Sequence, residues 1–416
     1  MRKIASELSL FFGIATRLHP RTGFGKLLLW IPKLLGSALS PILAFAGIVG
    51  FLAGVGKRKP GIALSGLIGS LLNTTHILKV TRESSSLAMA FGADFESRIP
   101  VDILPRLQSS RWSLATPAEA EVHRQDDLVV TSRPSTGEPL LADLWWPAED
   151  THPSGLGIIY LHGSGWHYGD KDLGTRPFFH HLVAQGHVIL DLAYALAPKA
   201  RLKDMLSDVA HAKDWMQTNG PRHGVRPDRI VLMGGSAGGH LALQSAYTQS
   251  EPPAGDRSIC GVVSYYGLTD LVALNRYLEG LYDSNINHPI DRLIMRYIDN
   301  LGNGMIVNPR DMLPNLLGGS YAKIPEKYRA ASPINHVGPH CPPTLQIFGA
   351  DDMAGVQQSI LHLHQALIAV GVPSVYIEIP DCDHGFDLVF PQISPSAQTA
   401  TYYTERFLAV LSSDTA

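Results

Sequence analysis

The sequence of 416 residues predicts an α/β domain with a mostly parallel central sheet, preceded by a helical hairpin in a membrane. Three observations carry this prediction. From about residue 119 onward, short apolar runs alternate with amphipathic segments, as in parallel sheets that helices cover on both faces. One of these runs leads into a glycine-rich turn and then a helix. The first part of the chain, by contrast, contains two long stretches without any charge.

The composition argues against several classes of protein. The formal net charge is −3, so the sequence offers no basic surface for nucleic acid. The cysteines at 260, 341 and 382 are scattered and lack the C-x-x-C spacing of zinc sites. His362 and His364 would point to different faces of a helix. We therefore expect neither a metal ion nor an organic cofactor.

Residues 1–33 form a basic arm. Lysines and arginines alternate there with short apolar pieces, and Glu7 is the one acid. The apolar residues 27–31 are expected to lie at a membrane interface, with Trp30 as an anchor.

Residues 34–79 are predicted to form a transmembrane helical hairpin. The stretch 34–56 contains no charge over 23 positions, which is long enough to span a bilayer core. Lys57, Arg58 and Lys59 interrupt it, and residues 61–78 form a second uncharged stretch. Both stretches are rich in Gly, Ala and Ser, which suits close helix packing in lipid. A buried soluble hairpin is the alternative, whereas the long basic arm disfavours a signal peptide.

The hairpin also gives an expectation about topology. With two spans, both ends face the same side, and the bases that flank these ends outnumber the three in the turn. The positive-inside rule therefore favours an α/β domain on the cytoplasmic side. Residues 80–118 are predicted to be a connector, because Pro100, Pro105 and Pro117 interrupt any long element. If the hairpin is only an anchor, a fragment that begins near residue 112 should keep the chemistry.

The catalytic domain is predicted over residues 119–416. We expect strands where short apolar runs occur, at 127–131, 140–146, 156–161, 187–192, 230–233, 260–266, 344–348 and 374–379. Helices are expected at 172–185, 203–219, 240–247, 356–370 and 398–411. In such a sheet, ligands bind beyond the carboxyl ends of the strands.

The stretch 228–243 carries the strongest functional signal. The apolar run 230–233 is followed by Gly-Gly-Ser-Ala-Gly at 234–238 and then by a helix start. This is the context of a nucleophile elbow, in which Ser236 sits on a strained turn that tolerates only very small neighbours. The N–H of Ala237 would face a developing oxyanion. A phosphate-binding turn is the alternative.

Three more candidates follow other predicted strands. His-Gly-Ser-Gly-Trp at 162–166 is a tight loop that can aim backbone N–H groups at an oxyanion. Asp351 and Asp352 follow the run 344–348, where a carboxylate can orient a histidine. The spacing favours Asp352, which leaves Asp351 as a capping residue or a solvated loop charge. His384 follows the run 374–379 and can reach Ser236 across the edge of the sheet.

These motifs resemble the α/β-hydrolase superfamily, and within it the hormone-sensitive-lipase-like carboxylesterases and the related formamidase-like esterases. The resemblance covers about residues 120–412. It includes Gly-Gly-Ser-Ala-Gly-Gly-His at 234–240 and the order serine, acid, histidine. The loop 162–166 departs from the family at Ser164, where a glycine is usual. The segment 193–198 departs at Ala193 and Ala195, which replace an aspartate and an arginine.

The resemblance implies a serine carboxylic-ester hydrolase that works through an acyl-enzyme. Ser236 would be the nucleophile, His384 the general base and then acid, and Asp352 the residue that orients it. The oxyanion hole would be formed by the N–H groups of Ser164, Gly165 and Ala237. Two alternatives stay open: an amidase, formamidase or acyltransferase on the same fold, and a non-catalytic ligand-binding membrane protein.

Residues 271–327 interrupt the alternation of strands and helices. The segment contains apolar residues at 293–298 and 305–306. We hypothesise that it caps the pocket and provides a site for a small or lipophilic ester. The alternative is a structural excursion that packs on the sheet.

Overall fold

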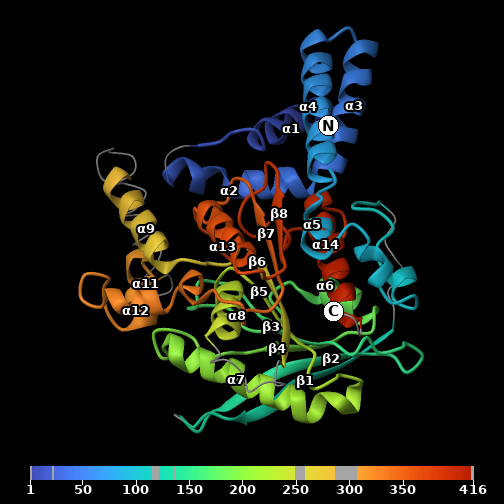
Figure 1. Cartoon of the computed structure of the whole chain (residues 1–416). Helices are drawn as coiled ribbons and strands as arrows, with labels where there is room; N and C mark the ends of the chain where they lie inside the picture. The colour runs from blue at the N-terminus through green and yellow to red at the C-terminus, as the bar shows by residue number, and fades with distance from the viewer. Residues whose placement is uncertain are drawn as a thin grey trace.

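The computed structural model describes residues 2–20, 23–114, 121–134, 136–248, 258–285 and 307–413, which are built around one eight-stranded sheet (Figure 1). The strands lie in the order β1-β2-β4-β3-β5-β6-β7-β8. β2 runs antiparallel to its two neighbours, and every other neighbouring pair is parallel. The bounds are β1 Val122–Ser132, β2 Pro139–Pro147, β3 Gly157–Leu161, β4 Val188–Leu192, β5 Ile230–Gly235, β6 Ile259–Tyr265, β7 Thr344–Gly349 and β8 Ser374–Ile379. The predicted mostly parallel sheet is confirmed.

Helices cover both faces of this sheet. The bounds are α6 Arg176–Val183, α7 Leu202–Asn219, α8 Ala237–Tyr247, α13 Gln357–Ala369 and α14 Pro395–Ser412. α6 and α14 lie side by side, joined by a 2.7 Å contact between His181 Nε2 and Glu405 Oε2. α7, α8 and α13 cover the other face (Figure 1). The completely buried strands β3, β4 and β5 lie between these layers, which explains why they read as continuous apolar runs.

One helix begins later than the sequence predicts. We expected a helix from residue 172, but α6 begins at Arg176. Asp172 has a left-handed φ of 64°, and its N–H donates to Asp191 Oδ2 over 2.6 Å. Gly174 follows with a φ of 74°. Left-handed backbone does not continue an α-helix, so the helix starts only after this turn.

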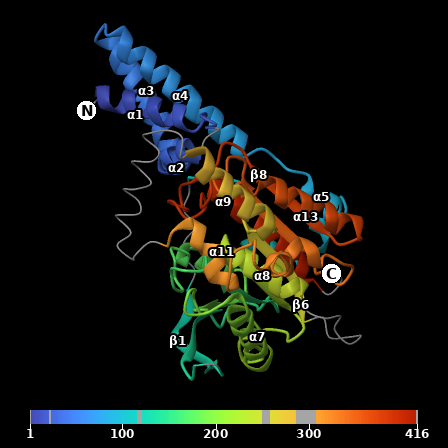
Figure 2. The same cartoon turned by 90° about the vertical axis from the view of Figure 1, so that its left-hand side faces the viewer.

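Four long helices come first in the chain: α1 Arg2–Ala15, α2 Gly23–Ala38, α3 Ser40–Gly56 and α4 Pro60–Val80. α3 and α4 form a hairpin that projects from the domain, with α1 beside them and α2 across the foot of the hairpin (Figures 1 and 2). The expectation of one continuous helix over 34–56 is wrong, because the chain bends by 78° between α2 and α3. Pro41 lies in the first turn of α3, where a residue without an N–H is favoured.

Glycines let the amino-terminal helices approach one another closely. A Cβ on Gly66 of α4 would lie 2.6 Å from Gly47 O and 2.5 Å from Phe51 N of α3. α1 packs antiparallel to α3, since Ser9 lies at Gly47 and Ser6 at Gly50. We call α1, α3 and α4 the helical bundle. Close contact through small residues is the mode of packing that membrane helices use.

The remaining segments carry short helices. Residues 80–118, predicted as a connector, contain α5 Ser86–Phe91 and two 3₁₀ turns, Phe95–Arg98 and Leu104–Arg106. Two more 3₁₀ turns are Gly220–His223 and Pro333–His336. The described parts of the predicted insert form α9 Leu271–Asn285, α11 Pro309–Leu317 and α12 Pro325–Ala330. Its apolar residues at 293–298 and 305–306 lie outside the described residues.

Candidate active site

Ser236 sits on a strained turn between β5 and α8. Its backbone has φ 54° and ψ −118°, a conformation that residues with a side chain rarely adopt. The flanking glycines explain how the turn fits. A Cβ on Gly234 would lie 2.5 Å from Leu161 O, and a Cβ on Gly238 would lie 1.9 Å from the same atom. The N–H of Ser236 donates to Tyr265 O over 2.8 Å, which fixes the turn against the neighbouring strand.

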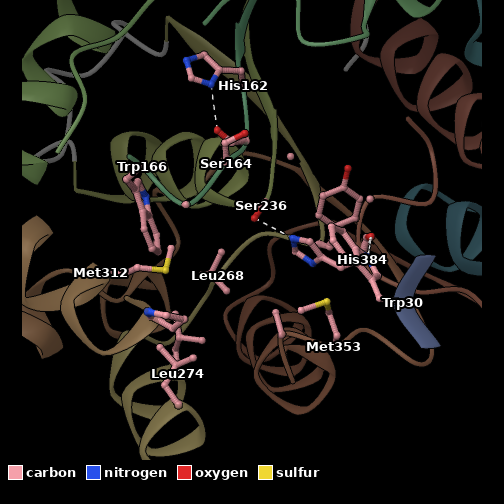
Figure 3. A pocket seen from close by; sticks show the side chains of 18 of the residues that line it. Trp30, His162, Ser164, Trp166, Ser236, Leu268, Leu274, Met312, Met353 and His384 are labelled. Atoms are coloured by element: carbon pink, nitrogen blue, oxygen red, sulfur yellow. Dashed lines mark hydrogen bonds between the residues drawn. The ribbon is translucent and has the colours of Figure 1, made fainter. Parts of the chain in front are cut away.

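The three residues that the sequence singles out for catalysis lie in one hydrogen-bonded chain. His384 Nε2 lies 2.9 Å from Ser236 Oγ (Figure 3). His384 Nδ1 lies 3.0 Å from Asp352 Oδ1 and 2.9 Å from Oδ2. Asp352 is completely buried, and its Oδ1 also accepts from the N–H of Ala354 over 2.8 Å. These contacts orient the imidazole with one nitrogen toward the carboxylate and the other toward the hydroxyl.

The environment of His384 favours its protonated form. Burial alone would lower the pKa of His384, but the nearby carboxylate of Asp352 outweighs it. The pKa of His384 is therefore raised above its ordinary value of 6.5. Neutral His384 can take a proton from Ser236, and the raised pKa means that the resulting imidazolium is stabilised beside Asp352.

Asp351 does not contact the histidine. It forms an ion pair with Lys33 of α2, whose Nζ lies 2.6 Å from Asp351 Oδ2. His19 Nδ1 lies 2.6 Å from the other oxygen. The expectation that Asp351 is a cap or a solvated charge is therefore wrong, because the amino-terminal helices cover it. The preference for Asp352 agrees with the geometry.

The loop after β3 is fixed by hydrogen bonds to its carbonyl groups. Within residues 162–166 every carbonyl oxygen accepts a hydrogen bond, from donors in Tyr194, His162, His167 and Ala197. Among the described residues, the N–H groups of Ser164 and Gly165 donate to no carbonyl. Ser164 and Gly165 have left-handed φ angles of 80° and 62°. The loop also lies against the nucleophile, since a Cβ on Gly163 would lie 3.5 Å from Ser236 Cβ. These features fit backbone donors for an oxyanion.

Ala237 completes this arrangement at the start of α8. It is the first residue of the helix, so its N–H has no acceptor within the helix. Backbone N–H groups at a helix start favour negative charge.

A largely apolar cavity of about 540 Å³ opens beside Ser236. Its walls come from α2, α9 and α11 as well as from the loops of the sheet, and Figure 3 shows Met312, Leu274 and Trp166 along one side. The apolar lining comprises Leu27, Trp30, Leu173, Leu268, Leu274, Leu278, Met312, Leu313, Met353 and Leu388. A cavity of this size holds a ligand of some tens of atoms. The predicted insert therefore contributes to the pocket through its described helices.

Two other ionisable residues near the site, His240 and Cys382, have pKa values shifted by burial. His240 is buried in α8, accepts from Trp166 Nε1 over 3.2 Å, and pairs with Ala331 O at 2.8 Å. Burial lowers its pKa to about 4, so it is a neutral packing residue. Burial likewise raises the pKa of Cys382 to about 12, so its thiol stays protonated at neutral pH. Among the described residues, no cluster of His, Cys, Asp and Glu could hold a metal ion.

The sequence did not indicate that α2 belongs to the site. Lys26, Leu27 and Trp30 line the cavity. The indole N–H of Trp30 donates to the backbone carbonyl of His384 over 2.9 Å. In the sequence, Trp30 has only the signature of a membrane-interface residue, and no local pattern connects it with a loop more than three hundred residues away.

Comparison with protein-family models finds the family described as BD-FAE, matched over residues 142–367. The chain is also similar to the probable carboxylic ester hydrolase LipM of Mycobacterium tuberculosis, with 26% identity over 95% of this chain and 89% of that protein. Esterase LipC of the same organism is 30% identical over 60% of this chain and 57% of its own length.

Solved structures give the same picture of the fold. Esterase B from Lactobacillus rhamnosis matches with a TM-score of 0.53 and 20% identity, over 82% of this chain and 96% of that chain. Carboxyl esterase 2 from the fungus Tuber melanosporum matches with a TM-score of 0.51 and 20% identity, over 79% of this chain and 99% of that chain. At this level of identity the likeness concerns the fold.

Proposed function

Because the chain belongs to the BD-FAE family and is a carboxylesterase with the α/β-hydrolase fold, we propose that it cleaves esters through an acyl-enzyme on Ser236. The observation that carries this proposal is the hydrogen-bonded chain from Ser236 through His384 to buried Asp352, beside an apolar cavity. Each member lies at the carboxyl end of a strand, where ligands bind in this fold.

The proposed reaction has two halves. In the first, Ser236 Oγ attacks the ester carbonyl while His384 Nε2 takes the hydroxyl proton. The N–H groups of Ser164, Gly165 and Ala237 stabilise the negative oxygen of the tetrahedral intermediate. His384 then protonates the leaving alcohol, and the acyl group stays on Ser236. In the second half, His384 activates a water molecule, which releases the acid and restores the serine.

The cavity supports a lipophilic ester as substrate. Its described walls carry leucine, methionine and tryptophan side chains, some of which come from α9 and α11 of the insert. Burying a methylene group there gains about 0.8 kcal/mol, so a chain that fills the cavity binds better than a short one. This supports the hypothesis that the insert caps an acyl or alcohol site.

The decisive experiment compares the full chain with its Ser236→Ala variant in detergent. A fluorophosphonate probe reports an activated serine, and a 4-nitrophenyl ester reports turnover. We expect the wild type to show both and the variant to lose the label and at least about 10³-fold in kcat. An unlabelled wild type that is folded would refute the proposal. A 4-nitroanilide measured alongside the ester tests for amide hydrolysis.

The same proposal places the helical bundle in a lipid bilayer. Among the described helices, α4 alone is long and apolar enough to cross a membrane by itself. α3 reaches the necessary length only when it is counted together with α2 as one bent span. The helical bundle buries the opposite kind of side chain from a water-soluble protein. Small and polar side chains face inward, whereas large apolar ones face outward. The inward set includes Ser6, Ser9, Gly47, Gly50, Ser70 and Asn73. The outward set includes Ile4, Phe11, Phe45, Leu52, Leu64 and Leu71.

The bundle has the dimensions that this placement needs. At 1.5 Å per residue, α3 with 17 residues and α4 with 21 are about 25 and 32 Å long, near the bilayer core of about 30 Å. The positive-inside rule favours the catalytic domain on the cytoplasmic side. A cysteine introduced at Arg58, in the turn of the hairpin, should then react with an impermeant thiol reagent added outside intact cells. If the introduced cysteine reacts only after the cells are broken, the hairpin turn lies inside the cell and the proposed orientation is wrong.

A further inference from the structure

We propose that Lys33 and Arg17 are positioning residues for the catalytic loops, so that the membrane helices are a working part of the active site. The inference rests on the proposed function and deepens it. It says that two cations from the amino-terminal helices hold the loops that carry Asp352 and His384. The hairpin would then be more than an anchor.

The first contact holds the loop of the acid. Asp351 is the direct neighbour of Asp352, at the end of β7. Lys33 Nζ lies 2.6 Å from Asp351 Oδ2 and 2.9 Å from Leu18 O, and the side chain of Lys33 is only 1% exposed. A lysine is seldom buried so completely unless an acid compensates its charge. The pair therefore attaches α2 to the residue beside the triad acid.

The second contact holds the loop of the histidine. Asp381 lies three positions before His384 and is 7% exposed. Arg17 Nη1 lies 2.6 Å from Asp381 Oδ2, and Lys79 Nζ lies 3.1 Å from the same oxygen. Burial alone would raise the pKa of Asp381, but these cations and His76 outweigh it and hold the pKa well below its ordinary range. Arg17 is fixed in turn by Thr75 of α4, over 2.7 Å.

Trp30 adds a third contact between the two regions. Its indole N–H donates to the carbonyl of His384 itself, and Figure 3 shows the two side chains next to each other. The catalytic loops are also joined to one another. The carboxylate of Asp383 accepts from the N–H of Met353 over 2.8 Å and from that of His384 over 2.7 Å. Movement of one loop is therefore transmitted to the other.

The acids that receive these contacts find their ion-pair partners only in the amino-terminal helices and the turn after α1. Among the described residues, Asp351 pairs with His19 and Lys33. Asp381 pairs with Arg17, His76 and Lys79. Without these cations, the partly buried carboxylate of Asp351 and the buried carboxylate of Asp381 would have no compensating charge. Because a misplacement of about 1 Å can cost about 100-fold in rate, the tethers bear directly on catalysis.

The test uses the full chain in lipid nanodiscs. The concentration of active sites is measured by titration with a fluorophosphonate, which labels the activated serine. Lys33→Met removes the ammonium group, Asp351→Asn removes the carboxylate charge, and the double variant removes both. We expect each variant to lower kcat per labelled site by about 10- to 100-fold with little change in KM. The double variant should lose no more than the worse single variant, because the residues act as one pair. Lys57→Met, an exposed lysine in the hairpin turn, is the matched control.

A double variant with wild-type kcat per labelled site would overturn the inference. Should a single variant not fold, the double variant decides, since it leaves no uncompensated buried charge. Trp30→Phe provides an independent check, because it removes one N–H and keeps an aromatic ring. Trp30→Phe should lower kcat several-fold if the hydrogen bond from Trp30 helps to position His384. An unchanged kcat would count against the inference. Failure of the wild type to label would refute the proposed function instead.

Discussion

At the scale of single residues, the site depends on which acid contacts His384. We expect Asp352→Asn to lower kcat by about 10³- to 10⁴-fold, because asparagine does not stabilise the imidazolium and favours the wrong tautomer. Active-site titration and steady-state hydrolysis of a 4-nitrophenyl ester measure this. Asp214→Asn, an exposed acid on α7, is the control. A kcat within tenfold of the wild type would remove Asp352 from the triad.

The pH profile gives a second test at the same scale. The pKa of His384 is raised above 6.5, since the carboxylate of Asp352 outweighs the effect of burial. The general base must be neutral, so kcat/KM should fall as the pH drops through this raised pKa. Asp352→Asn removes the largest effects that raise this pKa and leaves burial opposed only by the charges of Asp383 and Asp387, so the acid limb should move to lower pH. A limb at the same pH in both proteins would show that another group controls it.

The three residues proposed as the triad each carry a local signal in the sequence. Ser236 stands in a strand–turn–helix pattern with glycines on both sides. A side chain does not fit at these positions, since a Cβ on Gly238 would lie 1.9 Å from Leu161 O. Asp352 and His384 follow short apolar runs. Lys33 carries no such signal, because its partner lies 318 positions away and any surface acid would have fitted the sequence equally well.

At the scale of elements, the insert should determine substrate length. Leu274 of α9 lines the cavity, so Leu274→Trp should shorten the acyl chain that the enzyme prefers. Each methylene that no longer fits should lower kcat/KM about fourfold, the equivalent of about 0.8 kcal/mol. A series of 4-nitrophenyl esters from acetate to decanoate measures the change. Leu361→Trp on the outer side of α13 is the control, and an equal shift there would contradict the assignment.

The packing of the helical bundle can be tested at one glycine. Gly66→Ala places a Cβ 2.5 Å from Phe51 N, so the helices must separate, at a cost of about 1–3 kcal/mol. We expect a lower temperature for the loss of ester hydrolysis in nanodiscs. Gly61→Ala has open space and should match the wild type or exceed it. Equal midpoints for the two variants would contradict close packing at Gly66.

The strands could be predicted better than the helix boundaries. Buried parallel strands read as short apolar runs, and all eight predicted runs correspond to strands. The break between α2 and α3 lies inside an uncharged stretch, where Pro41, in the first turn of α3, is a weaker signal than an apolar run. The late start of α6 depends on the contact between Asp172 and Asp191, which brings together residues from different elements.

At the scale of the whole molecule, the amino-terminal helices and the α/β domain form one structure. The sequence suggested that a fragment from about residue 112 would keep the chemistry if the hairpin were only an anchor. If these helices position the catalytic loops, as we propose, such a fragment should lose activity, because it lacks Trp30 and three cations that contact Asp351 and Asp381. Docking of the two parts could not be predicted, since it relies on pairing between opposite ends of the chain.

The contact between Lys33 and Asp351 also bears on how the protein is made. The two residues are separated by 318 positions, so at roughly 5–20 residues per second the ribosome adds the acid about 16–64 s after the base. If the helices are membrane-embedded, as we propose, they have time to leave the ribosome and enter the bilayer during this interval. Lys33 and Arg17 cannot yet pair with Asp351 and Asp381, because these acids have not been synthesised. The enzyme would then become competent only at the end of translation, when the last part of the chain folds onto helices already embedded in lipid.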